Sequence, residues 1–281
     1  TPTGVVFFDF FEPVIGQHGR ISVRASLSGP GVDNATNLFG IWSKGQSPVE
    51  LDVREGDSVP SAEPGTVIAT LQDPSPVTQN NLSDAVVRTT LGGPSAIPGR
   101  TSAAISVGDS GAYLRLRDGD VAPGTDGALF SGPQFVLHPS SSMVVYSLLT
   151  GNGVVPANAS GLWYYSPDHE RLVVRSGSQA PGTLAGGTFS QLSGSNSLPA
   201  VNSQGKIAFN GGLTGPGVDG LNNSGVWLHD GGQVQLLVRA GKQVPGASAG
   251  VTFAQPANFG GDSRSLALSE DGAVKFLSLV R

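Results

Sequence analysis

Short apolar runs recur along the chain, and small or polar residues separate them. Examples are residues 206–213 (KIAFNGGL), 225–229 (GVWLH) and 234–240 (VQLLVRA). Gly, Asn, Asp and Pro bound each run. Such short, partly alternating runs are typical of β-strands, and no stretch keeps the period of an amphipathic helix. The pattern therefore predicts an all-β chain.

The strand pattern repeats in tandem. Four copies cover approximately residues 16–79, 80–137, 138–201 and 202–268, and matched positions lie 58 to 67 residues apart. Residues 1–15 and 269–281 each contain one further strand of the same kind. We therefore treat residues 1–281 as a single repeat domain, in which each copy forms three or four antiparallel strands.

All three Trp residues of the chain occupy one repeat position, two residues after a Gly: Trp42, Trp163 and Trp227. Aromatic side chains bury about 150–250 Å² each. A residue that recurs in the well-preserved copies is best explained as part of the core. The alternative is a platform on which sugar rings stack.

An Arg ends the third apolar run of every copy: Arg54, Arg117, Arg175 and Arg239. A guanidinium group has five donors in fixed geometry, so we expect it to cap carbonyl groups or to pair with a carboxylate. Asp57 and Asp120 lie three residues further on and are candidate partners. A ring of cations that binds an acidic polymer is the alternative.

A single small sheet cannot bury its apolar faces, so the copies must pack together. Radial blades and stacked solenoids both achieve this. We predict a β-propeller of four or five blades built from repeats of about 64 residues. The two terminal strands, 1–15 and 269–281, would close the ring and remove open sheet edges. An open β-repeat array is the alternative.

The fourth copy carries the motif Asn-x-x-Gly-x-x-Ala-Phe, with Asn202, Gly205 and Phe209 at its defining positions. This motif resembles that of the bacterial NxxGxxAF tandem-repeat family, whose members are often called choice-of-anchor proteins. The resemblance extends over nearly the whole chain and is weakest in the second copy. It implies an exported, surface-held protein of β-propeller type and implies no known catalytic activity.

Composition narrows the classes of partner. The formal net charge is -5, and no block of basic residues occurs, which argues against nucleic acid. Cysteine is absent, so disulfides, thiolate metal sites and cysteine nucleophiles are excluded. No apolar run reaches the ~18 residues of a membrane-spanning helix. The low charge and the Ser/Thr/Asn/Gly-rich surface favour a secreted or cell-surface setting.

Two loops rich in Gly and Asn, one containing Asp33 and the other Asp219, offer oxygen atoms to a cation. Calcium takes six to eight oxygen ligands, but each loop supplies one carboxylate and lacks the spacing of a calcium loop. We predict ordinary turns here, with weakly bound calcium as the alternative. No other cofactor is predicted.

Catalytic candidates are few, because the four His residues lack metal-binding spacing and no Gly-x-Ser-x-Gly elbow occurs. A glycosidase needs two carboxylates about 5–9.5 Å apart. Asp9 and Glu12 in the unusual N-terminal segment, and Asp118 and Asp120 in the most divergent copy, are the candidates.

These features predict an exported, non-enzymatic β-propeller that binds a polysaccharide or a protein partner at the cell surface. One alternative is a polysaccharide-acting propeller enzyme, a hydrolase or lyase, with a carboxylate pair at the central channel. The other is a structural subunit of an extracellular assembly, in which terminal strands exchange between chains.

Overall fold

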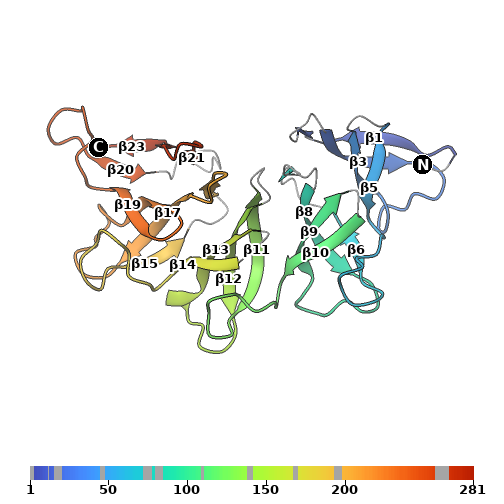
Figure 1. Cartoon of the computed structure of the whole chain (residues 1–281), viewed down its shortest axis with the longest axis horizontal. Helices are drawn as coiled ribbons and strands as arrows, with labels where there is room; N and C mark the ends of the chain where they lie inside the picture. The colour runs from blue at the N-terminus through green and yellow to red at the C-terminus, as the bar shows by residue number, and fades with distance from the viewer. Residues whose placement is uncertain are drawn as a thin grey trace. The chain divides into compact units, whose positions relative to one another are not determined.

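The computed structural model describes residues 3–11, 13–15, 21–44, 48–71, 78–79, 85–108, 111–137, 142–166, 170–192, 198–256 and 266–281. In these segments the regular structure consists of β-strands and the short 3-10 helix η2 (Pro156–Asn158) (Figure 1). None of the described segments forms a helix long and apolar enough to cross a membrane. The all-β prediction is confirmed.

Four antiparallel sheets follow one another along the chain. The first has the order β1 (Val6–Phe10), β3 (Ile21–Ser28), β4 (Phe39–Lys44) and β5 (Glu50–Arg54), with β2 (Val14–Ile15) on β3. The second has the order β10 (Gly111–Arg117), β9 (Ser102–Gly108), β8 (Ala85–Gly92) and β6 (Val67–Thr70), with β7 (Thr78–Gln79) on β8.

The third sheet has the order β11 (Leu129–Leu137), β12 (Met143–Thr150), β13 (Ser160–Tyr165) and β14 (Glu170–Arg175). The fourth has the order β15 (Thr188–Leu192), β17 (Ile207–Thr214), β18 (Ser224–His229) and β19 (Val234–Arg239), with β16 (Ala200–Val201) on β17. Tandem four-stranded antiparallel sheets are the architecture of propeller blades, as predicted. Closure into a ring stays a prediction.

Two smaller pairings follow the fourth sheet. β20 (Phe253–Pro256) pairs with β23 (Ser278–Val280), and β21 (Leu266–Leu268) pairs with β22 (Val274–Phe276). β15 and β16 pair in the same way with the two parts of β17. The segment 269–281 therefore supplies one strand to each of two further two-stranded sheets.

Each complete sheet is offset from the sequence copies. The first strand of each sheet comes from the end of the preceding sequence segment, and the other strands come from the copy that follows. Thus β6 of copy 16–79 pairs with β8 of copy 80–137, and β15 of copy 138–201 pairs with β17 of copy 202–268. The segment 1–15 supplies the corresponding strand, β1, to the first sheet.

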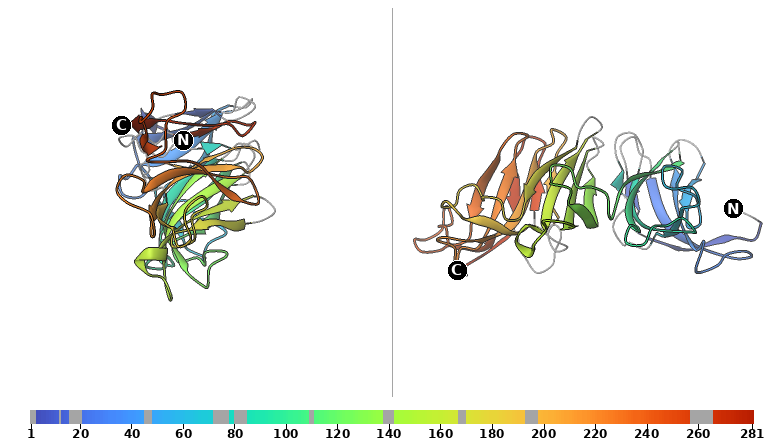
Figure 2. Two further views of the ribbon diagram at one scale, coloured as in Figure 1. Left: turned by 90° about the vertical axis from the view of Figure 1, so that its left-hand side faces the viewer. Right: turned by 90° about the horizontal axis from the view of Figure 1, so that it is seen from below.

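The chain divides into two compact units. The first contains Thr1–Asp120, Leu129–Pro133 and Leu137–Ser141, and the second contains Val121–Ala128, Gln134–Val136 and Ser142–Arg281. Inside each unit, neighbouring sheets stack face to face (Figure 2).

In the first unit, Ile41 of the first sheet packs in one core with Ile68 and Ile105 of the second. In the second unit, Leu162 of the third sheet shares a core with Trp227 of the fourth. Each large apolar side chain buried in these stacks contributes about 1.5–3 kcal/mol.

Candidate functional site

The Trp residues lie inside the molecule. Trp163 and Trp227 are fully buried and Trp42 is 3% exposed. The Trp163 indole Nε1 donates a hydrogen bond to the carbonyl oxygen of Pro123 at 2.8 Å, and Trp227 Nε1 donates to that of Pro181 at 3.1 Å. An indole has one donor, and burial leaves no free ring face for a sugar. All three Trp residues are thus core residues, and Trp163 and Trp227 also contact the preceding Pro-Gly turn.

The Gly before each Trp makes room for the indole ring. A Cβ added to Gly40, Gly161 or Gly225 would lie 2.4–2.8 Å from the Cη2 atom of the Trp two residues later. This contact explains why the chain repeats Gly-x-Trp as a unit.

The second sheet is built differently at this position. Ile105 stands opposite Val87 in the ladder, where Trp227 stands opposite Phe209 in the fourth sheet. Pro60-Ser61 replaces the usual Pro-Gly, and the Ser61 hydroxyl accepts a hydrogen bond from the Leu114 N–H at 2.5 Å. A side-chain contact therefore takes the place of the indole contact in this junction.

The recurring Arg residues form hydrogen bonds with nearby groups of the same chain. Arg175 Nε donates to the Asn158 carbonyl oxygen at 2.8 Å, and Arg239 Nε donates to the Asn222 carbonyl oxygen at 2.7 Å. Arg239 also donates to the Asn222 side-chain oxygen at 2.7 Å. The backbone N–H of Arg54 donates to Asp57 at 2.7 Å, so that carboxylate binds the main chain.

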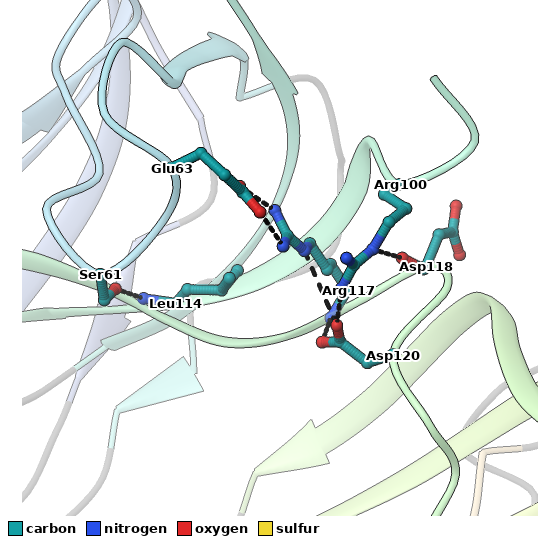
Figure 3. A network of polar contacts seen from close by, with 7 residues as sticks. All are labelled: Ser61, Glu63, Arg100, Leu114, Arg117, Asp118 and Asp120. Carbon is teal, nitrogen blue, oxygen red and sulfur yellow. Dashed lines mark hydrogen bonds and ion pairs between the residues drawn. The ribbon is translucent and has the colours of Figure 1, made fainter. Parts of the chain in front are cut away.

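Arg117 is the centre of a charged network in the first unit (Figure 3). Its guanidinium donates two hydrogen bonds, both of 2.6 Å, to the two carboxylate oxygens of Glu63. Arg117 Nε also lies 3.7 Å from Asp120 Oδ1, and Arg100 forms a further ion pair with Asp120. The network ties the connection after β5 to the end of β10.

The hydrogen bonds from Arg117 lower the pKa of Glu63 to about 2, and their reciprocal effect raises the pKa of Arg117. Glu63 is therefore ionised at neutral pH and is no proton donor for a glycosidase. Asp118 accepts the backbone N–H of Gly132 at 2.6 Å, and Asp120 accepts that of Arg117 at 2.9 Å. These contacts make the two candidate carboxylates parts of a structural network.

The N-terminal candidates lie elsewhere. Asp9 belongs to the exposed strand β1, and its backbone N–H donates to the Ser26 hydroxyl at 3.1 Å. Glu12 lies outside the described residues. Asp9 therefore belongs to the first sheet, whereas Asp118 and Asp120 follow the last strand of the second.

The two calcium candidates form turns in which the Asp side chain binds the local backbone. Asp33 Oδ1 accepts the N–H of Ala35 at 2.7 Å, and Asp219 Oδ1 accepts that of Leu221 at 2.8 Å. This is the local hydrogen bonding that Asp forms in turns. The described segments hold no group of three or more His, Cys, Asp or Glu side chains placed to bind a metal.

The NxxGxxAF residues form a buried turn. Asn202 is fully buried; its Oδ1 accepts the N–H of Lys206 at 3.0 Å, and its Nδ2 donates to the Ser269 and Glu270 carbonyl oxygens at 3.1 and 3.3 Å. Gly205 has a φ of +73°, which favours glycine. Phe209 is buried and stacks on Trp227 with centroids 6.2 Å apart. The motif thus links the turn before β17 to the corresponding turn before β22.

An open groove of about 390 Å³ lies in the second unit. Its polar lining consists of Asp219, Asn222, Arg239, Lys242, Thr252 and Arg281. Asn222 holds the Arg239 guanidinium in place, and Arg281 donates to the Leu221 carbonyl oxygen. The Lys242 side chain is exposed. Three cations and one carboxylate give the groove a positive balance.

The sequence pattern alone does not reveal this groove. It makes Asp219 a calcium candidate and Arg239 a structural residue, and the two lie 20 positions apart. A signal is present at Lys242, because this repeat position holds Asp57, Asp120 and Ser178 in the other copies. A cation at a repeat position that holds an acidic or neutral residue in the other copies indicates that the fourth copy differs locally from the others.

The fold and these contacts define an all-β repeat protein of blade-like sheets. Residues 1–281 match a family of unknown function, DUF7453, and the chain belongs to that family. No curated protein sequence matches the chain.

Two solved structures are similar in strand arrangement. One is the Penicillium chrysogenum α-L-arabinanase with arabinobiose (9% identity, TM-score 0.37), covering 94% of this chain and 74% of that one. The other is the GH93 α-L-arabinofuranosidase of Fusarium graminearum with arabinobiose (9% identity, TM-score 0.39), covering 100% and 76%.

Both similar proteins are named as enzymes, and the prediction of a non-enzymatic binding protein is corrected accordingly. Similarity at this level identifies no substrate and no catalytic residue of the present chain. Any activity must be argued from the chain's own groups.

Proposed function

We propose that this chain is an enzyme acting on an acidic polysaccharide, which binds in the groove around Arg239 and Lys242. The observation that carries the proposal is the grouping of a guanidinium fixed by Asn222, an exposed ammonium and a carboxylate in one open groove. A groove of about 390 Å³ falls within the range of about 300–1,000 Å³ for ligand sites.

Each group has a chemical role in this proposal. Arg239 offers planar donors that suit the carboxylate or sulfate group of an acidic sugar. Lys242 and Asp219 are groups of the lining that can transfer a proton to or from the substrate. Asn222 and Thr252 offer polar atoms to sugar hydroxyl groups. An acidic polymer outside the cell also agrees with the exported setting expected from the sequence.

The test is turnover of a polysaccharide panel by the purified chain. The panel contains uronate-rich, sulfated and neutral polymers, and the assay measures new reducing ends and unsaturated products. We expect products from an acidic polymer only. The variants Lys242→Ala and Asp219→Asn should lower kcat by about 10²-fold or more.

Lys275→Ala is the matched control, because Lys275 is also exposed in the second unit but lies on β22, outside the groove lining. It should retain full activity. Binding of polymers without any product would contradict the proposed enzyme. Full activity of Lys242→Ala would place the reaction elsewhere.

A further inference from the structure

Arg281 brings a charge to a repeat position that is neutral elsewhere. Its backbone pairs with Thr252 through two hydrogen bonds of 2.8 and 3.0 Å, as Thr214 pairs with Thr188 in the fourth sheet. The remaining copies hold small neutral residues at this position: Ser28, Gly92 and Thr150. The repeat fold therefore does not require an Arg here, and the side chain needs another explanation.

One loop fixes two guanidinium groups of the groove. Arg239 Nε and Nη2 donate to the carbonyl and side-chain oxygens of Asn222, both at 2.7 Å, and Nη2 lies 3.4 Å from the Gly217 carbonyl oxygen. Arg281 Nη2 donates to the Leu221 carbonyl oxygen. The two main acceptors belong to consecutive residues, so the guanidinium groups are held close together. Of the five N–H donors of Arg239, the two on Nη1 have no partner among the described residues.

The positive groups of the groove have no counter-ion in the part of the chain that the structure describes. No ion pair there involves a cation of the lining: Arg239, Lys242 or Arg281. The carboxylate of Asp219 accepts the Leu221 N–H instead. Arg117 is the opposite case, because Glu63 and Asp120 surround it. Like charges that are held close together repel, so an anionic ligand is favoured in the groove.

The arrangement of the two guanidinium groups distinguishes between acidic groups. A carboxylate has two oxygens in one plane, and a single guanidinium binds both with parallel hydrogen bonds. A sulfate ester has three terminal oxygens that point in different directions, so two guanidinium groups can bind it at once. A sugar unit carries one uronate carboxylate but can carry several sulfate esters, which also suits a lining with three cations and one carboxylate.

We propose that Arg239 and Arg281 together bind one sulfate ester, and that the acidic polysaccharide of the proposed function is a sulfated one. This inference rests on the proposed function, because it names the substrate class of the same groove. Lys242 and Asp219 then remain for proton transfer. Binding of the sulfate ester holds the sugar unit that carries it in the groove with these two groups.

The test is calorimetric titration of the chain, at low salt and without sulfate or phosphate in the buffer. The ligands are a sulfated galactose oligosaccharide, its desulfated form and a galacturonate oligosaccharide of the same length. The sulfated ligand should bind about 10-fold or more tightly than either of the others. Arg281→Gln should weaken its binding by about 10-fold or more and leave the galacturonate affinity within about 3-fold. Lys275→Gln is the matched control and should bind like the wild type, because Lys275 is exposed on β22 outside the lining.

A graft makes the test independent of any loss of folding. Arg175 donates to the Asn158 carbonyl oxygen as Arg239 donates to that of Asn222, and the exposed Thr214 occupies the repeat position of Arg281. Thr214→Arg should therefore create a second pair of guanidinium groups, and the number of sulfated oligosaccharides bound per chain should rise from one to two. A number that stays at one would overturn the proposal, because the pair would then be insufficient.

The outcomes separate this inference from the proposed function. Galacturonate binding that equals or exceeds binding of the sulfated ligand would overturn the inference, while turnover of a uronate polymer would leave the enzyme standing. An unchanged sulfate affinity in Arg281→Gln would overturn the inference as well. Sulfate-dependent binding that is lost in Arg281→Gln, without any product from a sulfated polymer, would support the sulfate site and contradict the enzyme.

Discussion

Gly161 tests whether the Gly-x-Trp unit is set by contact with the indole ring. A Cβ at Gly161 would lie 2.4, 2.8 and 3.1 Å from three ring atoms of Trp163, and these are the nearest atoms to that position. The substitution Gly161→Ala therefore forces the ring or the strand to move. Overpacking of this kind costs about 1–3 kcal/mol of stability.

The same substitution should reverse its sign once the ring is removed. In a strand, Ala is favoured over Gly by roughly 0.5–1 kcal/mol. In the Trp163→Leu background, Gly161→Ala should therefore raise the free energy of unfolding. Trp163→Leu alone should lower it by about 2–4 kcal/mol, including about 1 kcal/mol for the hydrogen bond to Pro123. The coupling between the two sites, which is the sum of these two effects, should be about 1.5–4 kcal/mol.

The assay is urea unfolding of the wild type, both single variants and the double variant, followed by circular dichroism. Gly232→Ala is the control, because no described atom lies within 4 Å of its Cβ position. It should change stability by less than about 0.5 kcal/mol. An equal loss from Gly161→Ala in the wild-type and Trp163→Leu backgrounds would refute the ring contact as the cause.

Three further predictions concern charged and polar groups. The pKa of Glu63 lies at about 2 in the folded chain, below its ordinary value of 4.5, so its contribution to stability is present above about pH 4.5 and is lost toward pH 2. Glu63→Gln should flatten this part of an acid-unfolding curve, and an unchanged curve would contradict the assignment. His229 is buried, and burial with nearby Arg171 lowers its pKa, so the neutral form is favoured and stability falls as pH drops below about 6.5. His229→Gln should reduce that fall in thermal unfolding between about pH 7 and 5, and an identical slope would argue against it. Asn202→Ala leaves buried backbone groups without partners and should cost about 2–4 kcal/mol in urea unfolding, whereas Ser203→Ala should cost less than about 1. Similar losses for the two variants would contradict the central role of Asn202.

Local patterns predict the strands and the recurring core positions well. The register of Trp42, Trp163 and Trp227 can be read directly, because alternation in a strand is a property of neighbouring residues. The positions of the turn glycines can also be predicted from the sequence, because a turn involves only neighbouring residues.

Contacts between distant segments cannot be read in this way. Trp163 binds Pro123, 40 residues away, and Arg117 pairs with Glu63, 54 residues away. The sequence points instead to Asp120, three residues from Arg117, because only near neighbours can be judged by spacing. The groove is another such case, because Asp219 and Lys242 lie on either side of the paired strands β18 and β19 in the sequence and line one groove only in the folded chain.

The offset between sheets and sequence copies has a consequence for how such a chain can grow. A segment one repeat long contains each strand type once, wherever the segment begins. A duplicated segment inserted in register would pass its final strand to the next sheet and receive its own first strand from the previous one. Duplication would thus add one whole sheet, with its Pro-Gly and Trp contacts, and would leave no new unpaired edge between old and new parts.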